Sequence, residues 1–302
     1  MKKKELKKLR HGDKDYTAAS FIILPKDFVE KFGLTGVVDT EFDESSKIYI
    51  LNWLNFNMTY YILSDIHLEF HIDNLSISNE DIDKIIGRYF EVADNILFAG
   101  DAGNDIKTQI RLYEYLSWKY KNVYIVFGNH DLCYNKNNTS ENRILEVKKY
   151  LPKNVYLLNG NSINNISGTM GMCDFDKDHT PYDIFKWKQW FDGTHWNYMD
   201  MNPYNIKKFE INKLNVCIKS KPNIIMTHYI PEQAGINEQY INDPFNKYFI
   251  FNANEQLEMI EKDTYWIYGH THNKRISSYI NKIKDYPILN LYYWKLPYNL
   301  WQ

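Results

Sequence analysis

Short apolar runs alternate with amphipathic stretches from residue 59 onward. The runs are rich in Ile, Val, Tyr and Phe and end abruptly at polar residues, which predicts buried strands. The predicted strands are residues 60–63, 96–99, 123–127, 223–226 and 265–268. The predicted helices are residues 79–90, 105–120 and 141–151. Candidate N-caps are Ser78 or Asn79 and Thr139 or Ser140. Strands that alternate with helices are typical of a layered α/β domain.

Two later segments extend this pattern. Residues 275–279 and 288–294 are predicted to be closing strands of a second sheet, separated by a polar turn at 281–285. Residues 174–203 are crowded with Asp, Trp, Tyr and His and show no regular periodicity. We therefore expect an irregular excursion there, which is a candidate substrate lid.

The first 57 residues do not follow the alternation. Residues 20–51 run in the order strand, Pro25, short helix at 26–32, Gly33-Leu34 and two β-rich runs. This order resembles the swapped-hairpin DNA-binding domain of the AbrB type, which implies DNA binding or a homodimer formed through the segment. A β-α-β-β order also occurs in small domains with no DNA role. The division predicted is an appendage at 1–57 and a main domain at 58–302.

Composition limits the partners of the chain. Its 302 residues carry a formal net charge of −2, which gives no global attraction to nucleic acid or to an anionic membrane. The basic run at residues 2–10 is short, and such runs are usually solvated. The three cysteines form no CxxC pair, and no apolar run approaches the roughly 20 residues of a membrane span. We expect a cytoplasmic protein that does not enter a membrane.

Polar residues that can bind metal follow each of the five predicted strands. The motifs are Asp65-Ile66-His67, Gly100-Asp101, Gly128-Asn129-His130-Asp131, Thr227-His228 and Gly269-His270-Thr271-His272. Five of the nine histidines fall inside these few residues. In open α/β sheets, sites form at the carboxyl ends of strands, so the motifs are expected to converge. Asp, Asn and His without Cys are ligands for a hydrolytic divalent metal such as Mn²⁺, Fe or Zn²⁺.

The order of these motifs resembles that of the calcineurin-like metallophosphoesterases, whose signature is DxH, GD, GNH(D/E), H and GHxH. The resemblance covers residues 59–294 and is closest to the bacterial and phage-type small phosphoesterases. It implies a four-layer α/β/β/α sandwich and two divalent metal ions, with Mn²⁺ expected first and Fe, Zn²⁺ or Ni²⁺ as alternatives. It also implies hydrolysis of phosphate mono- or diesters, as a phosphatase or phosphodiesterase, by in-line attack of a metal-bridging hydroxide.

The resemblance assigns a role to each motif residue. The first metal would be bound by Asp65, His67 and His272, and the second by Asn129, His228 and His270. Asp101 would bridge the two metals. His130 would bind the phosphoryl group, together with Asn129, or protonate the leaving oxygen. Two aspartates and a hydroxide leave two divalent cations with net positive charge, so the site would attract a phosphate.

The sequence departs from the family at two positions near these ligands. Asn104 stands where the protein-phosphatase branch has an Asp that orients the catalytic histidine, and the phosphate-binding Arg of that branch is missing. An amide can fix the imidazole tautomer but cannot stabilise its charged form as a carboxylate does. Both differences argue against a phosphoserine or phosphothreonine phosphatase. Tyr229 follows His228 where many relatives carry a second His.

Other readings of the chain stay open. A nuclease of the same superfamily would share the ligands, although the main domain shows no obvious basic track. A DNA-binding regulatory protein would use the N-terminal segment, with the phosphoesterase fold as scaffold. Asp174, Asp176, Asp178 and His179 could form an extra metal site, but a solvated loop is the better interpretation. The tryptophans at 187, 190 and 196 could stack on a substrate ring, but packing of the lid onto the domain is favoured.

Overall fold

The structure is a computed structural model that describes most of the predicted main domain. The described residues are 51–52, 59–90, 93–133, 139–175, 178–198, 201–233, 236, 245–261, 264–271, 275–280 and 285–290. The AbrB-like segment predicted at 20–51 therefore lies outside the described residues, apart from Leu51.

The first of two sheets has the strand order β1-β2-β3-β4-β5. Its strands are β1 (Leu51–Asn52), β2 (Thr59–Leu63), β3 (Asn95–Phe98), β4 (Asn122–Ile125) and β5 (Val155–Leu157). Strands β2 to β5 are parallel, whereas β1 pairs antiparallel with β2. Leu51 and Asn52, which the sequence assigned to the appendage, thus add a short edge strand to the main domain.

The second sheet has the order β10-β11-β9-β8-β7-β6. Its strands are β6 (Asn161–Ile163), β7 (Ile166–Gly168), β8 (Ile224–Met226), β9 (Tyr265–Tyr268), β10 (Arg275–Ile280) and β11 (Asp285–Asn290). The inner strands β7, β8, β9 and β11 run parallel, and the outer strands β6 and β10 pair antiparallel with their neighbours. The five strands predicted before the ligand motifs are confirmed as β2, β3, β4, β8 and β9.

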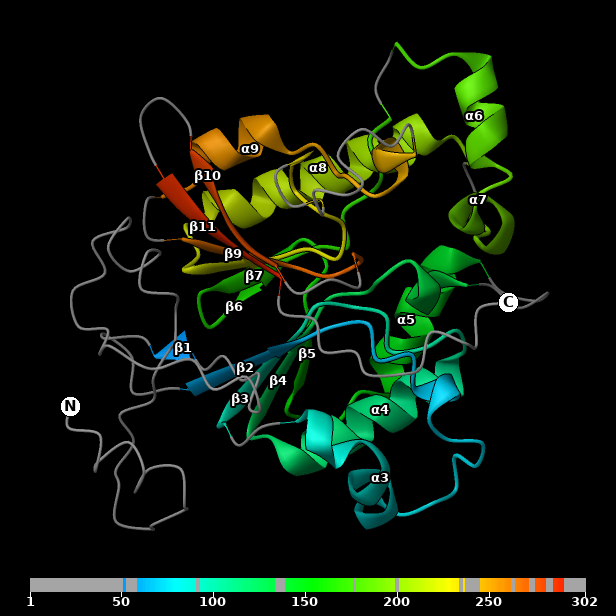
Figure 1. Cartoon of the computed structure of the whole chain (residues 1–302), viewed down its shortest axis with the longest axis vertical. Helices are drawn as coiled ribbons and strands as arrows, with labels where there is room; N and C mark the ends of the chain where they lie inside the picture. Colours follow the sequence, from blue (N-terminus) through cyan, green and yellow to red (C-terminus); the bar gives the residue numbers. More distant parts are fainter. Residues whose placement is uncertain are drawn as a thin grey trace.

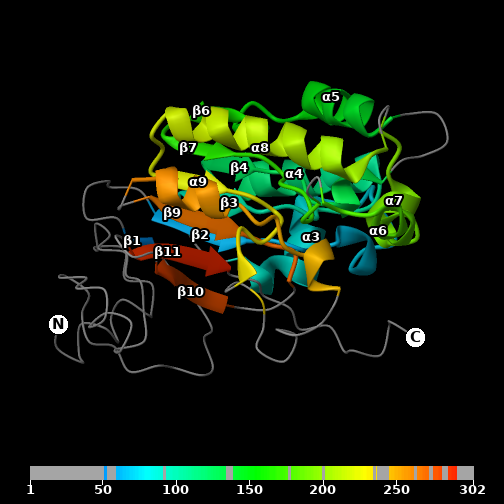
Figure 2. The same ribbon diagram turned by 90° about the horizontal axis from the view of Figure 1, so that it is seen from above.

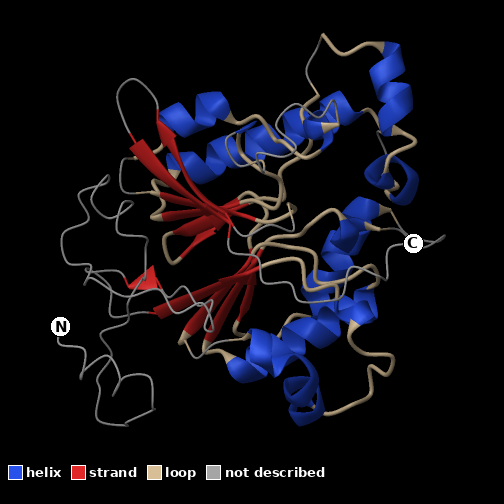
Figure 3. Ribbon diagram, in the orientation of Figure 1, coloured by secondary structure: helices blue, strands red, loops and turns tan. Residues whose placement is uncertain are grey.

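The two sheets stack on each other, and helices cover their outer faces (Figure 3). Side chains alternate along each strand, since successive residues point to opposite faces. On β2, Tyr60 and Ile62 belong to the apolar cluster between the sheets, whereas Tyr61 and Leu63 belong to the cluster that includes the helices. The predicted four-layer α/β/β/α sandwich is confirmed.

Helices α3 (Asn79–Ile86), α4 (Ile106–Lys119) and α5 (Ser140–Tyr150) lie against the first sheet (Figure 1). All three were predicted, and α3 is followed by the 3₁₀ turn η2 (Gly87–Tyr89). The side chain of Ser78 caps α3 by accepting from the amide of Asp81, and that of Thr139 caps α5 by accepting from the amide of Asn142.

Helices α8 (Pro203–Lys219) and α9 (Asn254–Met259) cover the second sheet, as the view from above also shows (Figure 2). Neither was predicted. Short 3₁₀ turns follow several strands and loops, namely η1 (Leu68–Phe70), η3 (His130–Leu132) and η6 (Asn246–Tyr248). No helix within the described ranges is long and apolar enough to cross a membrane.

Two expectations from the sequence need correction. The expected irregular excursion at 174–203 contains helices α6 (Pro181–Trp187) and α7 (Phe191–His195). These helices are too short to produce a periodic pattern, although Thr180 and Asp183 form a capping box at the start of α6. The last strand, β11, begins at Asp285, within the turn expected at 281–285 and ahead of the strand expected at 288–294.

Candidate metal centre

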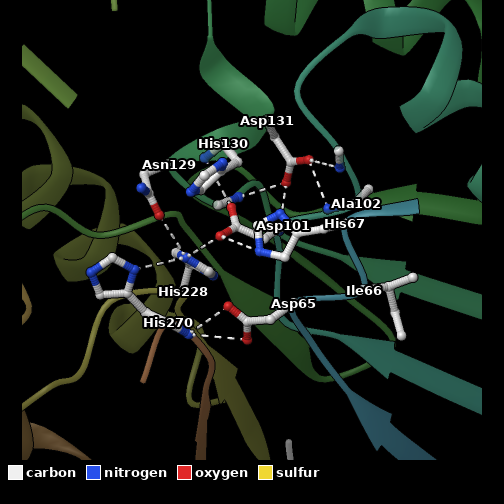
Figure 4. A network of polar contacts seen from close by, with 12 residues as sticks. Asp65, Ile66, His67, Asp101, Ala102, Asn129, His130, Asp131, His228 and His270 are labelled. Atoms are coloured by element: carbon white, nitrogen blue, oxygen red, sulfur yellow. Dashed lines mark hydrogen bonds and ion pairs between the residues drawn. The ribbon is translucent and has the colours of Figure 1, made fainter. Parts of the chain in front are cut away.

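The polar ends of five strands meet at one edge of the two sheets (Figure 4). Asp65 and His67 come after β2, and Asp101 after β3. Asn129 and His130 follow β4, while His228 and His270 follow β8 and β9. The structure therefore brings together every predicted ligand that it describes. His272 lies outside the described residues.

Two groups of candidate metal ligands share one carboxylate. His67, Asp101 and His130 form the first group, and Asp101, His228 and His270 form the second. Within each group, one ligand atom from each residue lies within 4.8 Å of the others. The sharing of Asp101 matches its predicted role as a bridge. The first group contains His130, which was predicted to bind substrate, and does not contain Asp65.

The carboxylate of Asp101 is only 1% exposed, and its two oxygens have different surroundings. Oδ1 accepts a hydrogen bond of 2.9 Å from the backbone amide of His130. Oδ2 lies 3.6 Å from Nε2 of His67 and 3.3 Å from Nε2 of His228. Burial alone would raise the pKa of Asp101, but the nearby imidazoles of His228, His130 and His67 hold it well below its ordinary value.

The surroundings of the His228 ring indicate that the centre requires a positive charge. Its Nδ1 lies 2.8 Å from the carbonyl oxygen of Ala99, which can only accept, so Nδ1 carries a proton. In the neutral ring, Nε2 then has a lone pair, yet it faces Oδ1 of Asn129 at 3.0 Å and Oδ2 of Asp101 at 3.3 Å. Acceptor atoms that face one another in a buried site need a proton or a metal cation between them.

The pKa of His228 agrees with this requirement. Burial lowers it, but the charge and hydrogen bond of Asp101, the charge of Asp65 and the Ala99 carbonyl outweigh burial and raise the pKa to about 9. A proton on Nε2 would thus supply positive charge where a divalent cation would otherwise bind. The described ligands, which are carboxylate and amide oxygens and imidazole nitrogens, fit such a cation.

Four of the candidate ligands adopt the left-handed backbone region that is uncommon outside glycine. The φ angles are 56° at Asp65, 45° at His67, 61° at Asp101 and 71° at His270. Such conformations cost free energy and cluster at functional sites, where the surrounding structure holds them. Here the backbone amides of Asp65 and His67 donate to the carbonyl oxygens of Gly100 and Asp101, at 2.8 and 3.1 Å.

The carboxylate of Asp131 gathers the loops that carry these ligands. It is fully buried and accepts from four backbone amides, namely those of Asp101 (2.8 Å), Ala102 (2.8 Å), Gly103 (3.3 Å) and Gly128 (2.7 Å). Burial and the charge of Asp101 raise the pKa of Asp131 to about 7, against the hydrogen bonds from Gly128 and Asp101 that lower it. Asp131 ends the Gly128-Asn129-His130-Asp131 motif, but no role was predicted for it from the sequence.

A glycine stands before each of Asp101, Asn129 and His270, and a residue without Cβ is expected to permit close approach of the loops. A Cβ atom at Gly128 would lie 2.1 Å from Oδ1 of Asp101, and one at Gly269 would lie 2.7 Å from the carbonyl oxygen of Ala99. Gly100 has a φ of +91°. The expectation is confirmed because side chains at these positions would collide with the centre.

His130, which belongs to the first group, is held by Asn104. Its Nδ1 is 2.7 Å from Oδ1 of Asn104, and the thiol of Cys133 also donates to that oxygen at 3.7 Å. The ring of His130 meets the ring of His67 edge-on at 4.5 Å and stacks on Phe191 at 4.0 Å. The structure therefore places Asn104 where the sequence expects the residue that orients His130.

Comparison with known proteins agrees with this geometry. The family model of the calcineurin-like phosphoesterases matches residues 58–274. The chain belongs to the calcineurin-like phosphoesterase family. Among solved structures it is similar to the phosphopantetheinyl hydrolase of Mycobacterium tuberculosis, with a TM-score of 0.54 and 12% identity over 78% of this chain and 89% of that one. At this identity the likeness shows the fold alone. The comparison with curated proteins found no match.

Three residues around the centre of this calcineurin-like phosphoesterase were not predicted to contact it. Asp192 on α7 is 1% exposed and accepts from Nδ2 of Asn129 at 3.1 Å and from the hydroxyl of Tyr229 at 2.6 Å. Burial raises the pKa of Asp192 to about 7, although both hydrogen bonds lower it. Nε1 of Trp196 donates to the backbone oxygen of Asn129 at 2.8 Å. The one signal in the sequence for these contacts was Tyr229, which follows His228 in place of a second histidine.

The remaining residues of the 174–203 segment mostly pack. Trp187 is fully buried, with its ring edge-on to Trp196 at 6.3 Å, and Trp190 stacks on Tyr248 at 5.1 Å. These contacts confirm the packing interpretation over substrate stacking for Trp187 and Trp196. In the acidic cluster, Asp174 pairs with Lys207, and His179 lies against Phe175 at 4.5 Å. Asp176 lies outside the described residues.

Proposed function

We propose that the protein hydrolyses phosphate mono- or diesters of a small or nucleotide-like substrate at a centre of two divalent cations, with Mn²⁺ as the first candidate. The observation that carries the proposal is the position of Asp101 Oδ2, which faces an imidazole of each ligand group. Membership of the calcineurin-like phosphoesterases supports phosphate-ester hydrolysis as the reaction.

The described residues would divide between the two cations. His67 and Asp65 would bind the first, and the predicted His272 would join them. Asn129, His228 and His270 would bind the second, with Asp101 shared by both. Asp65 also accepts from the backbone amide of His270 at 3.2 Å, so it couples the two loops. When bound, two divalent cations would polarise the phosphoryl oxygens and lower the pKa of water towards neutrality.

His130 is the residue best placed to act on the leaving group. Since an amide oxygen accepts from Nδ1, the proton that His130 transfers would be on Nε2. Asn104 keeps a proton on Nδ1 of His130 but supplies no negative charge to stabilise the imidazolium. The ring contacts with His67 and Phe191 keep His130 from rotating away.

The experiment that tests this function uses the metal-free full-length protein. Addition of Mn²⁺ should restore hydrolysis of p-nitrophenyl phosphate or its bis ester. Asp101→Asn and His228→Ala should each lower kcat/KM by more than about 100-fold. Each changes a residue that would bind a cation directly, and this costs more than loss of a residue that only orients a ligand. His179→Ala, a histidine outside the centre, should keep the wild-type rate.

Three outcomes would contradict or redirect the proposal. Full activity of Asp101→Asn, or full activity in the presence of a chelator, would contradict it. Cleavage of DNA with a much higher kcat/KM than that of the bis ester would instead favour the nuclease alternative.

A further inference from the structure

We propose that Asp192 and Tyr229 are positioning residues that orient the side-chain amide of Asn129, so that its oxygen faces the second cation. The inference rests on the proposed two-cation function and adds to it a pair of residues outside the ligand motifs. It starts from Asp192, a buried carboxylate carried by α7, 63 residues along the chain from Asn129.

Both oxygens of Asp192 are engaged. Oδ1 accepts from Nδ2 of Asn129 at 3.1 Å, and Oδ2 accepts from the hydroxyl of Tyr229 at 2.6 Å. Neither candidate group of metal ligands among the described residues includes Asp192. Asp192 is therefore a partner of a ligand and not a ligand itself.

The contact decides which atom of the Asn129 amide faces the centre. Asp192 accepts from the NH₂ group of Asn129, which leaves Oδ1 on the opposite side, 3.0 Å from Nε2 of His228. A reversed amide would place an oxygen against the carboxylate of Asp192 and an NH₂ group, which cannot bind a metal, towards the centre. Orientation of this amide thus determines whether the second cation has an oxygen ligand from Asn129.

Tyr229 contacts His270, one ligand of the second cation, and reaches Asn129, another, through Asp192. Its hydroxyl holds Asp192, while its ring lies 4.4 Å from the ring of His270 at an angle of 41°. Tyr229 is fully buried and directly follows His228, so its backbone is fixed by the same loop. The tyrosine that replaces the second histidine of many relatives therefore acts on Asn129 through Asp192.

The alternative is that Asp192 and Tyr229 only attach α7 to the domain. The two readings differ in what a substitution does to metal binding. A purely structural contact would, when lost, weaken both cations together or neither. A positioning pair would weaken the second cation selectively, because its hydrogen bonds and its ring contact lead to Asn129 and His270, which would both bind that cation.

The test titrates metal-free full-length protein with Mn²⁺ by calorimetry and follows the paired-manganese signal by electron paramagnetic resonance. Wild type should bind two Mn²⁺. Asp192→Ala and Tyr229→Phe should weaken one binding event by about 10- to 100-fold, the range for loss of a partner that orients a ligand, and should leave the other event unchanged. Asp192→Asn should restore most of the affinity, since its carbonyl oxygen can still accept from Asn129.

Matched controls separate positioning from general damage. Asn197→Ala changes an exposed residue of the same segment, and Tyr248→Phe removes a hydroxyl from another buried tyrosine beside Trp190. Both should bind two Mn²⁺ with wild-type affinity. Tyr229→Phe removes a single oxygen atom, so it keeps the test decisive if Asp192→Ala does not fold.

The outcomes distinguish this inference from the proposed function. Wild-type protein that binds two Mn²⁺, with the same affinities in Tyr229→Phe, would overturn the positioning role alone. Equal weakening of both binding events in Tyr229→Phe would also overturn it. A wild-type protein that binds fewer than two Mn²⁺ would overturn the proposed two-cation centre, and the inference with it.

Discussion

The two halves of the candidate metal centre are held in different ways. Asp65, His67 and Asp101 follow neighbouring strands of one sheet, and their loops are joined by backbone hydrogen bonds, while the carboxylate of Asp131 holds the Asp101 loop to Gly128. Asn129 is instead held by the side chains of Asp192 and Trp196, and the ring of His270 lies against those of Tyr229 and Phe249. One half is built by local backbone geometry, and the other by side chains from distant parts of the chain.

The difference explains which changes each half can tolerate. Backbone contacts do not depend on the side chains of the loop residues, so the first half is sensitive mainly to Asp131 and to the glycines. The second half can be altered through single side chains that touch no cation. Substitutions should therefore separate the two halves in metal-binding experiments.

The largest effect is expected from Asp131→Ala, which leaves four buried backbone amides without their acceptor. The free energy of unfolding should fall by at least about 3 kcal/mol, since each unsatisfied buried group costs roughly 1–3 kcal/mol. Urea unfolding measures this loss. Affinity for both cations should fall together, because Asp131 joins the loops of Asp101 and Asn129.

Asp131→Asn, which retains one acceptor oxygen, should lie between the wild type and Asp131→Ala. Asp81→Ala removes a surface aspartate paired with Lys84 and should leave the free energy of unfolding close to that of the wild type. An Asp131→Ala protein as stable as the wild type would show that this carboxylate does not stabilise the loops of the first half.

A smaller and selective effect is expected from Trp196→Phe. The variant loses the 2.8 Å hydrogen bond from Nε1 to the backbone oxygen of Asn129. A net hydrogen bond contributes about 1 kcal/mol, so affinity for the second Mn²⁺ should fall roughly fivefold, while the first stays unchanged. Trp187→Phe makes the same chemical change in a buried indole that packs against Trp196, and its Mn²⁺ affinities should match the wild type. Loss of the first cation in Trp196→Phe would argue against two separately held halves.

The smallest change is expected from Asn104→Asp. This substitution changes the hydrogen-bond partner of His130 and none of the proposed metal ligands. A carboxylate beside Nδ1 stabilises the imidazolium, so the pKa of His130 should rise. If His130 acts as a general acid, activity is lost as the pH rises through that pKa, and the alkaline limb of the pH–rate profile should move to higher pH. An unmoved alkaline limb, with the variant folded, would mean that His130 does not donate the proton.

The first half could be predicted from the sequence, and the second only in part. Each motif residue stands within a few residues of its strand end, so recognition of β2, β3 and β4 was enough to place Asp65, His67 and Asp101. Asp192 could not be found in this way. It stands between Phe191 and Gly193 in a segment crowded with polar and aromatic residues, and nothing local connects it to Asn129.

Helix α8 was missed for a related reason. Its buried face contains Ile206, Leu214 and Cys217, but a charged residue, Glu210, interrupts that face. The carboxylate of Glu210 is buried because it accepts from the hydroxyl of Thr169 and the amide of Gly171 and pairs with Lys213. An apolar periodicity cannot reveal a helix whose central buried position holds a carboxylate that tertiary hydrogen bonds stabilise.

The most direct test of the account is a crystal structure of the full chain with Mn²⁺, with manganese located by its anomalous scattering. The account predicts two Mn²⁺ ions, both contacting the carboxylate of Asp101, with Oδ1 of Asn129 on the second. A single ion, or two ions that do not share Asp101, would contradict it.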